Sequence, residues 1–563
     1  MTAPRPINLR PFLWVPSLYL AMGIPFNIIM GGTAARMYKS LGYSDGQITV
    51  ALGSIGVAWS LKPLWAALLD MYGTKKFFVL AMEVLIAGLL VAVAMILPTT
   101  DFFRASIALF WIAAFASSTQ DICADGIYLT ALRKPEQARL AGLQSTFWVL
   151  GKVLASGVLI SVLDRIKLAE GWPEQKMWVM VIVACAGVMG LLAALHAFTL
   201  PAGRPARRPE GVRQVVTEFR ETAVSFFHKR MFWGMIGFVF LYRLGEGLIL
   251  MEGQLFLQSA VSQGGLGLTA GQVSDIDALW GTLATILGGL LGGVFVSRYG
   301  LARMLVVLAL FLNVPSFAYV YLSQAAATGH GLDYTTIATL VSIEKFGYGF
   351  GFIGNMIYMM QQLAPGRCTM THYAFATALM NLVMVPTNMI SGPLAERLGF
   401  ATFFIVVMVV SVPSVWAAWK APHPAEPAGA DAAGTSPDEL NFVTPDDPSR
   451  LDDASRRVQV LAGRASIYAM LNILAILLID TKALGMLQAD GSGRMPLGLL
   501  VASLGLKVCF SHRAWCIARE TETEAGRTQE RIYVRNARGA RMVTILCGAA
   551  SCSVLALAVT LAL

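Results

Sequence analysis

Apolar stretches of roughly 20 residues recur along the chain and are separated by short polar loops. Each stretch is long enough to cross a hydrocarbon core of about 30 Å as a helix. Twelve of them precede residue 421, over residues 12–38, 48–69, 77–98, 105–132, 140–163, 176–199, 231–257, 270–297, 302–323, 336–362, 370–394 and 398–419. The short alternating segments typical of a closed β-barrel are absent from the sequence. The pattern predicts an all-α integral membrane protein.

These stretches divide into two groups of six around a basic loop. The division predicts an N-terminal six-helix bundle over 1–199, a cytoplasmic loop over 200–230 and a C-terminal six-helix bundle over 231–420. The loop's basic residues are Arg204, Arg207, Arg208, Arg213, Arg220, Lys229 and Arg230. Because Lys and Arg favour cytoplasmic loops, the N-terminus is also predicted to be cytoplasmic. The first apolar stretch has no small-residue cleavage site and is predicted to be a retained helix.

A different composition begins after Lys420. Residues 421–464 are rich in Pro, Ala and Asp and predict a disordered cytoplasmic linker. Residues 465–563 form a predicted C-terminal membrane appendage with about three extra hydrophobic segments, over 465–481, 496–511 and 541–563. The first two segments are short, so interfacial or re-entrant placements remain open for them.

The amino-acid composition limits which partners and which kinds of site are expected. Hydrophobic residues make up 56% of the chain and charged residues only 14%, so lipid is the expected solvent. The formal charge of +9 is spread through short loops without a basic-aromatic patch, and no nucleic-acid partner is expected. The seven cysteines contain no C-x-x-C pair and predict neither a disulfide framework nor a metal site.

Two short loops echo each other in the two halves. Residues 66–76 read AALLDMYGTKK and residues 293–303 read GVFVSRYGLAR, with a turn glycine and bases in the same phase. They resemble the signature G-x-x-x-D-R-x-G-R-R of the major facilitator superfamily, although Ala66, Met71 and Ser297 depart from it. The resemblance implies a conformational latch formed by Asp70, Gly73, Lys75, Lys76, Arg298, Gly300 and Arg303.

Further strings resemble the AmpG-type muropeptide permeases and their acetyl-CoA transporter-like relatives. They are AWSLKPLWAALLD around Lys62, QDICAD over 120–125, LYRLGE over 241–246 and GTLATILGGLLGGVFVSRYGLAR over 281–303. The resemblance implies a secondary transporter of the bacterial inner membrane that imports a solute by proton-coupled alternating access. It favours a muropeptide or related amino-sugar cargo, with a siderophore, another anionic small molecule or an acyl-CoA compound as alternatives. Lys345 and His372 depart from the pattern, so the cargo is open to divergence.

Ionisable residues inside the apolar stretches are the candidates for chemistry. An ionised group at bilayer depth costs at least about 2.5–3.5 kcal/mol, so each should face a partner or a wet cavity. The predicted proton-coupling acids are Asp121, Asp125, Glu246 and Glu344. Asp121 and Asp125 are four residues apart and share a helical face that Lys62 can reach. The alternative is that these acids only lock helices together through ion pairs.

The predicted substrate-binding residues are Lys62, Gln120, Lys152, Tyr242, Arg243 and Lys345. Four cations together would create a positive cavity that favours a carboxylate or phosphate cargo. Each cation also has the alternative of pairing with an acid of its own. Other polar residues in the spans, among them Asn27, Trp148, Tyr348, Asn381 and Asn388, would contact a sugar-like ligand or pack between helices.

Three classes of function compete for this pattern. A secondary transporter fits the repeated halves and the buried charges, and the sequence lacks G-x-x-x-x-G-K-[ST], so no ATP motor is expected. A membrane-embedded transferase would need clustered histidines, and the six present are scattered. A sensor would use the C-terminal appendage. We expect a monomeric transporter that needs a small-molecule substrate, the lipid bilayer and a proton gradient, and no cofactor.

Overall fold

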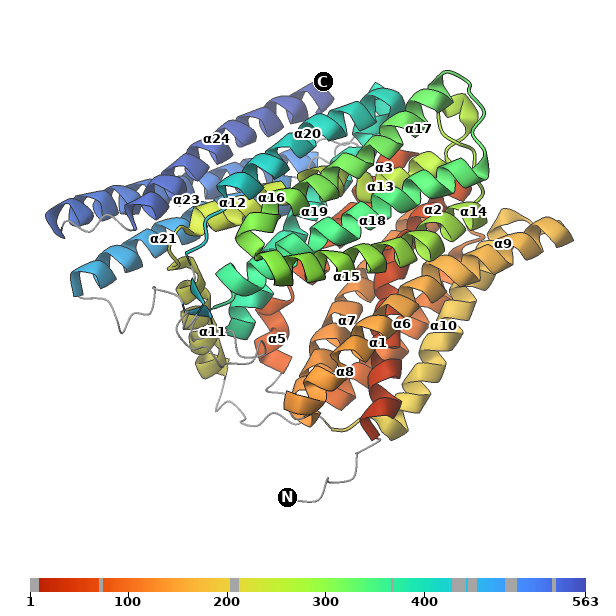
Figure 1. Ribbon diagram of the computed structural model, residues 1–563, viewed down its shortest axis with the longest axis horizontal. Coiled ribbons are helices and arrows are strands. Elements are labelled where there is room, and N and C mark those ends of the chain that lie inside the picture. Colours follow the sequence, from red (N-terminus) through yellow and green to blue (C-terminus); the bar gives the residue numbers. More distant parts are fainter. Residues whose placement is uncertain are drawn as a thin grey trace.

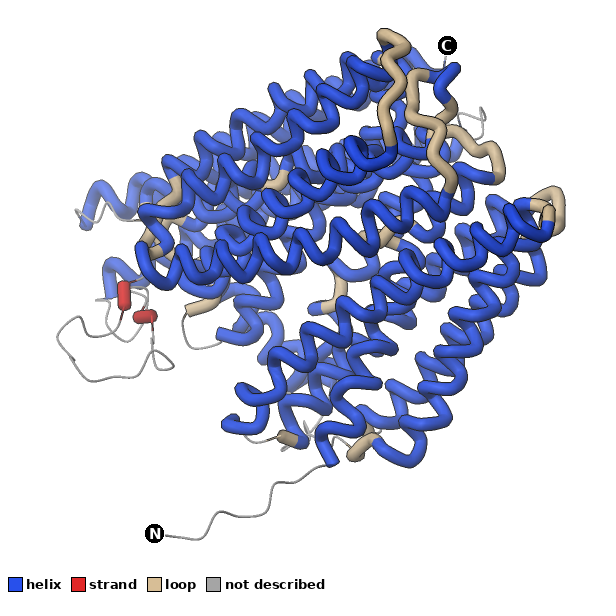
Figure 2. Tube along the Cα trace, turned by 45° about the vertical axis from the view of Figure 1, so that its right-hand side comes forward, coloured by secondary structure: helices blue, strands red, loops and turns tan. Residues whose placement is uncertain are grey.

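The described part of the chain is almost entirely helical (Figure 1). The structure is a computed structural model, and it describes residues 10–69, 74–132, 134–202, 212–365, 369–424, 426–427, 442–443, 453–480, 494–528 and 533–562. Two strands of two residues each, β1 (Glu426–Pro427) and β2 (Phe442–Val443), pair antiparallel near the helical body (Figure 2).

The N-terminal half is a bundle whose first two spans are broken into shorter helices. Its elements are α1 (Arg10–Ile29), α2 (Thr33–Ser40), α3 (Asp45–Ile55), α4 (Val57–Ser60), α5 (Pro63–Leu69), α6 (Lys75–Ile96), α7 (Phe102–Ala131), α8 (Lys134–Lys152), the π-helical turn η1 (Val153–Val158), α9 (Leu159–Glu170) and α10 (Glu174–Thr199). The break between α1 and α2 falls at Gly32, whose φ of 103° lies in the left-handed region that favours glycine.

The C-terminal half follows α11 (Val212–Phe227), a helix in the basic loop. Its elements are α12 (Phe232–Tyr242), α13 (Leu244–Gln258), η2 (Val261–Gln263), α14 (Ala270–Ser274), the π-helical turn η3 (Asp275–Trp280), α15 (Gly281–Tyr299), α16 (Leu301–Asn313), η4 (Val314–Ser316), α17 (Phe317–Ala327), α18 (Tyr334–Tyr358), the π-helical turn η5 (Met359–Leu363), α19 (Thr369–Leu398) and α20 (Phe400–Lys420). Within α15 and α18, Gly288 and Gly349 permit a close approach: an added Cβ would lie about 2 Å from a backbone oxygen of the facing helix.

The predicted all-α membrane fold is confirmed. Twelve described helical segments are long and apolar enough to cross a membrane, and eleven of them match predicted spans before residue 421. The span predicted over 336–362 corresponds to α18, which is 25 residues long but falls outside this set. Its charged and amide residues, Glu344, Lys345 and Asn355, lower its hydropathy and are buried in protein.

The two halves meet at one end of the molecule and diverge toward the other (Figure 1). We call the meeting end, which includes residues 33–49, 155–167, 254–277 and 388–396, the closed end. We call the opposite end, with Lys75, Lys76, Arg298 and Arg303, the basic end. Hydrogen bonds between the halves gather at the closed end: Asp164 accepts from Thr269 Oγ1 at 2.7 Å and from the Gly271 amide at 3.2 Å.

The C-terminal appendage packs on the C-terminal half as three long helices. They are α21 (Asp453–Ala475), extended by the π-helical turn η8 (Ile476–Asp480), α23 (Arg494–Thr528) and α24 (Val534–Ala562). The predicted linker over 421–464 is therefore wrong at its end, because α21 begins at Asp453. The structure describes 421–424, 426–427 and 442–443 between α20 and α21. Among the described residues of this appendage, Ser455–Ala475 is long and apolar enough to qualify as a span.

Contacts with the end of the basic loop hold this appendage in place. Trp233 Nε1 donates to Ser466 Oγ at 3.1 Å, and Asn536 Nδ2 donates to the Lys229 carbonyl at 2.7 Å. His228 packs against Gly463 of α21. Burial, together with the charge of Arg464, lowers the pKa of His228 to about 4. A neutral imidazole thus fills this junction at physiological pH, because its charged form would be poorly solvated there.

Candidate functional site

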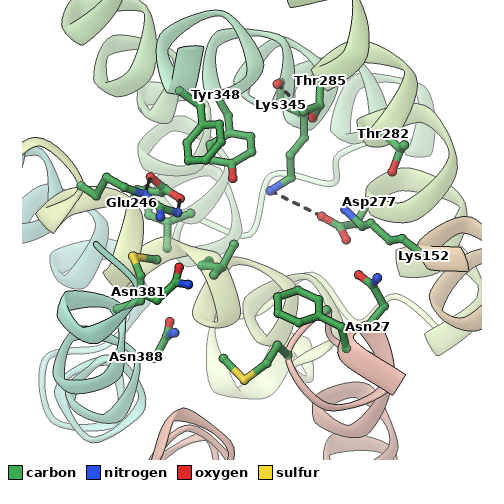
Figure 3. Close-up of a pocket in the computed structure, with 18 of the residues that line it drawn as sticks. Asn27, Lys152, Glu246, Asp277, Thr282, Thr285, Lys345, Tyr348, Asn381 and Asn388 are labelled. Atoms are coloured by element: carbon green, nitrogen blue, oxygen red, sulfur yellow. Dashed lines mark hydrogen bonds and ion pairs between the residues drawn. The ribbon is translucent and has the colours of Figure 1, made fainter. Parts of the chain in front are cut away.

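A cavity of about 400 Å³ lies between the two halves and is lined by both of them (Figure 3). The N-terminal half contributes side chains from α1, α4 and α8, and the C-terminal half from α13, η3, α15, α18 and α19. This volume falls within the range of small-molecule sites. A binding site at the junction of two bundles is also where a moving pair of halves would expose it to each side in turn.

A fully buried arginine, Arg36 of α2, ties the halves together beside this cavity. Its guanidinium donates to Gln254 Oε1 at 2.9 Å, to Ser274 Oγ at 2.9 Å and to Asp277 Oδ2 at 3.0 Å. A fourth bond, of 2.5 Å, goes to the Ser156 carbonyl within its own half. Three of these four bonds cross from one half to the other. The halves therefore cannot separate here without breaking the hydrogen bonds that the guanidinium makes to the C-terminal half.

Asp277 is the centre of a longer charged chain. Its other oxygen, Oδ1, lies 3.4 Å from Lys345 Nζ, and that ammonium lies 3.3 Å from Glu344 Oε2. Lys152 projects into the cavity from the opposite half, toward the side of Asp277 (Figure 3). Its ammonium forms no ion pair or hydrogen bond with another described residue. Lys152 therefore reaches the cavity without a paired acid among the described residues.

Two π-helical turns position these side chains. Lys152 ends α8 directly before η1, and Asp277 lies inside η3. The two turns contact each other across the boundary between the halves. A π-helical turn shifts the register of side chains along a helix and is frequent at functional sites. The widened turns thereby direct the side chains of Asp277 and Lys152 toward the cavity.

Arg243 and Glu246 form a second charged pair on the cavity wall. Arg243 Nε donates to Glu246 Oε2 at 2.7 Å, and a second guanidinium nitrogen contacts Glu246 Oε1. The guanidinium also lies over the Phe352 ring, 4.9 Å from its centroid. Bidentate pairing and stacking hold this arginine and its glutamate in a fixed position on the cavity wall.

Aromatic and amide side chains form the rest of the wall. The Phe26 ring packs against Trp59 and Trp148, with centroids 5.1 Å and 5.4 Å apart. Asn388 is fully buried, and its amide nitrogen and oxygen have no hydrogen-bond partner among the described residues. Such groups are costly when left unpaired, so a polar ligand would be stabilised by meeting them.

The predicted coupling and binding residues fall into two groups, one that lines the cavity and one that does not. Glu246, Glu344, Lys152, Arg243 and Lys345 line the cavity. The remaining predicted coupling and binding residues, Lys62, Gln120, Asp121, Asp125 and Tyr242, do not line it.

Lys62, which the sequence placed within reach of Asp121, forms an ion pair with it, and this pair lies within the N-terminal half. Asp125 accepts a 2.8 Å hydrogen bond from Tyr19 Oη. Gln120 donates to Glu83 at 3.1 Å, within a buried group in which Glu83 also contacts His196 Nδ1 at 2.8 Å.

Tyr242 donates to the Gly351 carbonyl at 2.8 Å and is fully buried between helices of the C-terminal half. For Gln120 and Tyr242 the packing alternative therefore describes the contacts better than ligand binding.

The predicted latch residues lie at the basic end where they are described. Lys76 Nζ donates to the Ala197 carbonyl at 2.7 Å, which joins α6 to α10. Gly300 has a φ of 82°, in the left-handed region, and allows the turn between α15 and α16. Arg298 and Arg303 are exposed, and Lys75 packs along Gly126 of α7. Asp70 and Gly73 lie outside the described residues.

Four residues of the central network were not among the predicted site residues. Arg36 lies inside the first apolar stretch, and its charge there was a usable signal, because an arginine at that depth needs partners. Asp277 was recognisable as an acid in a span, but nothing in the sequence placed it opposite Arg36. Gln254 and Ser274 carry no sequence signal of their own, since polar residues in spans more often pack between helices.

The architecture and the cavity define a multi-pass membrane transporter built from two helical halves. A family model of the Major Facilitator Superfamily matches residues 17–385. The chain belongs to this superfamily.

The chain also has relatives that are similar in sequence over most of its length. The chain is 26% identical to the anhydromuropeptide permease of Escherichia coli K12, over 69% of this chain and 75% of that protein. It is 22% identical to the Rickettsia conorii protein named AmpG 4, over 70% and 92%.

Its fold is similar to that of the nucleoside transporter NupG, with a TM-score of 0.54 and 17% identity, covering 73% of this chain and 98% of that one. It is also similar to a D-xylose-proton symporter, with a TM-score of 0.53 and 12% identity, covering 74% and 98%.

Proposed function

We propose that this transporter imports a cell-wall sugar–peptide fragment across the bacterial inner membrane, driven by protons and acting as a monomer. In this proposal the basic end faces the cytoplasm, as the bias of Lys and Arg toward inside loops favours. The halves, joined at the closed end, then represent the state that is shut toward the outside. The similarity to the anhydromuropeptide permease of Escherichia coli supports this choice of cargo.

The observation that carries the proposal is the charged chain Arg36–Asp277–Lys345–Glu344 beside an unpaired Lys152. A cargo carboxylate attracted to Lys152 would also compete with Asp277 for Lys345. That competition loosens contacts around Asp277, one of the three residues through which Arg36 holds the halves together. Binding energy is thereby used to change the relative stability of the open and closed arrangements, which alternating access requires.

The apolar wall supports the sugar part of the cargo. Trp59 and Trp148 offer flat faces to the apolar face of a sugar ring, while Asn388 offers one donor group and one acceptor to hydroxyl or amide groups. An anionic siderophore would use the cationic residues but would leave the Asn388 amide without a clear role.

Proton coupling is assigned to carboxyl groups that face the cavity. Glu246 and Glu344 line it, and each is held by a cation, Arg243 and Lys345 respectively. When cargo draws Lys345 away, Glu344 loses its cation in a buried place and favours its protonated form. Asp121 and Asp125 meet the same chemical requirement but lie within the N-terminal half.

Uptake into sealed proteoliposomes tests the proposal. Labelled anhydromuropeptide should accumulate when the outside is acidic, and a protonophore should abolish the accumulation. An unlabelled siderophore added in excess should leave uptake unchanged. Competition by the siderophore, or product formation without net uptake, would contradict the proposal.

A further inference from the structure

A carboxyl group at the closed end has no partner that explains its burial. Glu252 of α13 is fully buried, and both of its carboxyl oxygens lack a hydrogen bond within the described part of the chain. The nearby Ser391 hydroxyl donates instead to the Asn388 carbonyl, at 2.8 Å. Glu252 is therefore held in protein without the solvation that an ionised carboxylate requires.

Two other carboxylates lie near Glu252, and both of them have hydrogen-bond partners. Asp45 of α3 receives a 2.6 Å bond from Lys39 of α2, and Glu396 of α19 accepts the Gly46 amide at 2.8 Å. These two carboxylates have partners, and Glu252 does not. Their negative charges also disfavour a third charge beside them, while Lys39 is already engaged by Asp45.

An ionised carboxylate buried without a partner is far more costly than a neutral carboxylic acid in the same place. Glu252 can stay in the closed end only if it carries a proton. Asp45 and Lys39 belong to the N-terminal half, whereas Glu252 belongs to the C-terminal half. Separation of the halves would therefore admit water to Glu252 and allow it to ionise.

We propose that Glu252 is a proton-binding site of the closed end, where closure takes up one proton from water and opening releases it. This site is distinct from the cavity carboxyl groups Glu246 and Glu344. The inference rests on the alternating access of the proposed function, but it needs no particular cargo. Among the described residues, no group of three or more His, Cys, Asp or Glu side chains that could hold a metal ion includes Glu252.

Distances across the closed end test this linkage in the absence of cargo. Spin labels are attached to Leu168→Cys and Val261→Cys, two exposed positions on opposite halves, in an otherwise cysteine-free full-length protein in lipid nanodiscs. With one linked proton, the ratio of closed to open protein should fall by up to about tenfold per pH unit above the titration point of the open state. The variant Glu252→Gln should stay closed and lose this slope.

A matched variant and a second measurement complete the test. Glu396→Gln keeps an amide oxygen for Gly46 and should retain the pH slope. Infrared spectra of the unlabelled protein should show a protonated-carboxyl band that is missing from Glu252→Gln and present in Glu396→Gln. An unchanged slope in Glu252→Gln, the same band in both variants, or a closed fraction that follows Na⁺ at constant pH and ionic strength would overturn the proposal. These measurements use no cargo. A failure to transport anhydromuropeptide would therefore count against the proposed cargo and would leave the test of Glu252 unaffected.

Discussion

Two charged clusters in the membrane-spanning region have similar composition but join different parts of the molecule. The Asp277 cluster, comprising Arg36, Asp277, Lys345 and Glu344, connects the two halves beside the cavity. The Asp121 cluster, comprising Lys62, Asp121, Asp125 and Tyr19, stays within the N-terminal half. Both satisfy the rule that charge at bilayer depth needs a partner. Only the first changes partners if the halves move apart.

The side chains of the two clusters also differ in how deeply they are buried. The side chains of Arg36 and Asp277 are 0% and 3% exposed, whereas those of Lys62 and Asp121 are 28% and 20% exposed. The second pair is therefore less enclosed by protein than the first. The comparison teaches that the location of a charge relative to the interface between the halves decides its role more than its depth does.

Removing the acid of the Asp277 cluster should have the largest effect. Asp277→Asn leaves the Arg36 guanidinium buried without its counter-charge, and breaking a buried pair in this way costs about 3–5 kcal/mol. We expect a large loss of thermal stability in detergent and no measurable uptake in proteoliposomes.

Asp275→Asn is the matched control for this variant. Asp275 lies two residues away in η3 and pairs with Arg165, whose side chain is 72% exposed. An exposed pair contributes about 0–1 kcal/mol. Equal losses of stability from the two substitutions would show that the comparison between the clusters is mistaken.

The unpaired cation of the cavity should affect cargo binding without affecting folding. Lys152→Ala removes one charge-assisted hydrogen bond to an anionic cargo, a contribution of about 1.5–3 kcal/mol, or roughly 10–100-fold in KM. Uptake kinetics measure this change, and the melting temperature should remain near the wild-type value. Lys152→Arg should recover part of the affinity, and an unaltered KM in Lys152→Ala would remove this lysine from the site.

The Asp121 cluster should tolerate substitution better. Asp121→Asn breaks the pair with Lys62, and since both side chains are less buried than those of Arg36 and Asp277 we expect a smaller loss of stability than for Asp277→Asn. The KM for cargo should be unchanged, because neither side chain lines the cavity. A marked rise in KM for this variant, measured alongside Lys152→Ala, would return the Asp121 cluster to the cargo site.

The smallest effect is expected at the basic end. Arg298→Ala removes an exposed side chain that stacks on Tyr299, so stability should stay within about 0.5 kcal/mol of wild type. If Arg298 belongs to the latch, the turnover number should fall while KM remains constant. Arg303→Ala provides a second latch position, and two variants with wild-type turnover would exclude the latch role for both arginines.

Much of the fold was predictable because each span is long and apolar enough to be recognised alone. The paired loops around Gly73 and Gly300 also identified the relation between the halves. The end of the linker was not predictable by hydropathy, because the first turns of α21 are rich in Asp, Ser and Arg and become helical together with the apolar residues that follow.

The site was only partly predictable for a related reason. Spacing along one helix can show that Asp121 and Asp125 share a face, but it cannot show which helices of the two halves meet. The chain Arg36–Asp277–Lys345 joins α2, η3 and α18, which are far apart in sequence. Sequence reasoning therefore found most of the cations and acids that line the cavity, and it missed the contact between Arg36 and Asp277 that connects the halves.

The most direct test of the central claim is the accessibility of a cysteine placed in the cavity. Asn381→Cys, in an otherwise cysteine-free protein, would be exposed to a membrane-impermeant thiol reagent from each side of oriented membrane vesicles. We predict modification from the basic end in the resting state, and protection by added anhydromuropeptide. Modification from neither side by this reagent, but ready reaction with a lipid-soluble one, would contradict a cavity that alternates between the two halves.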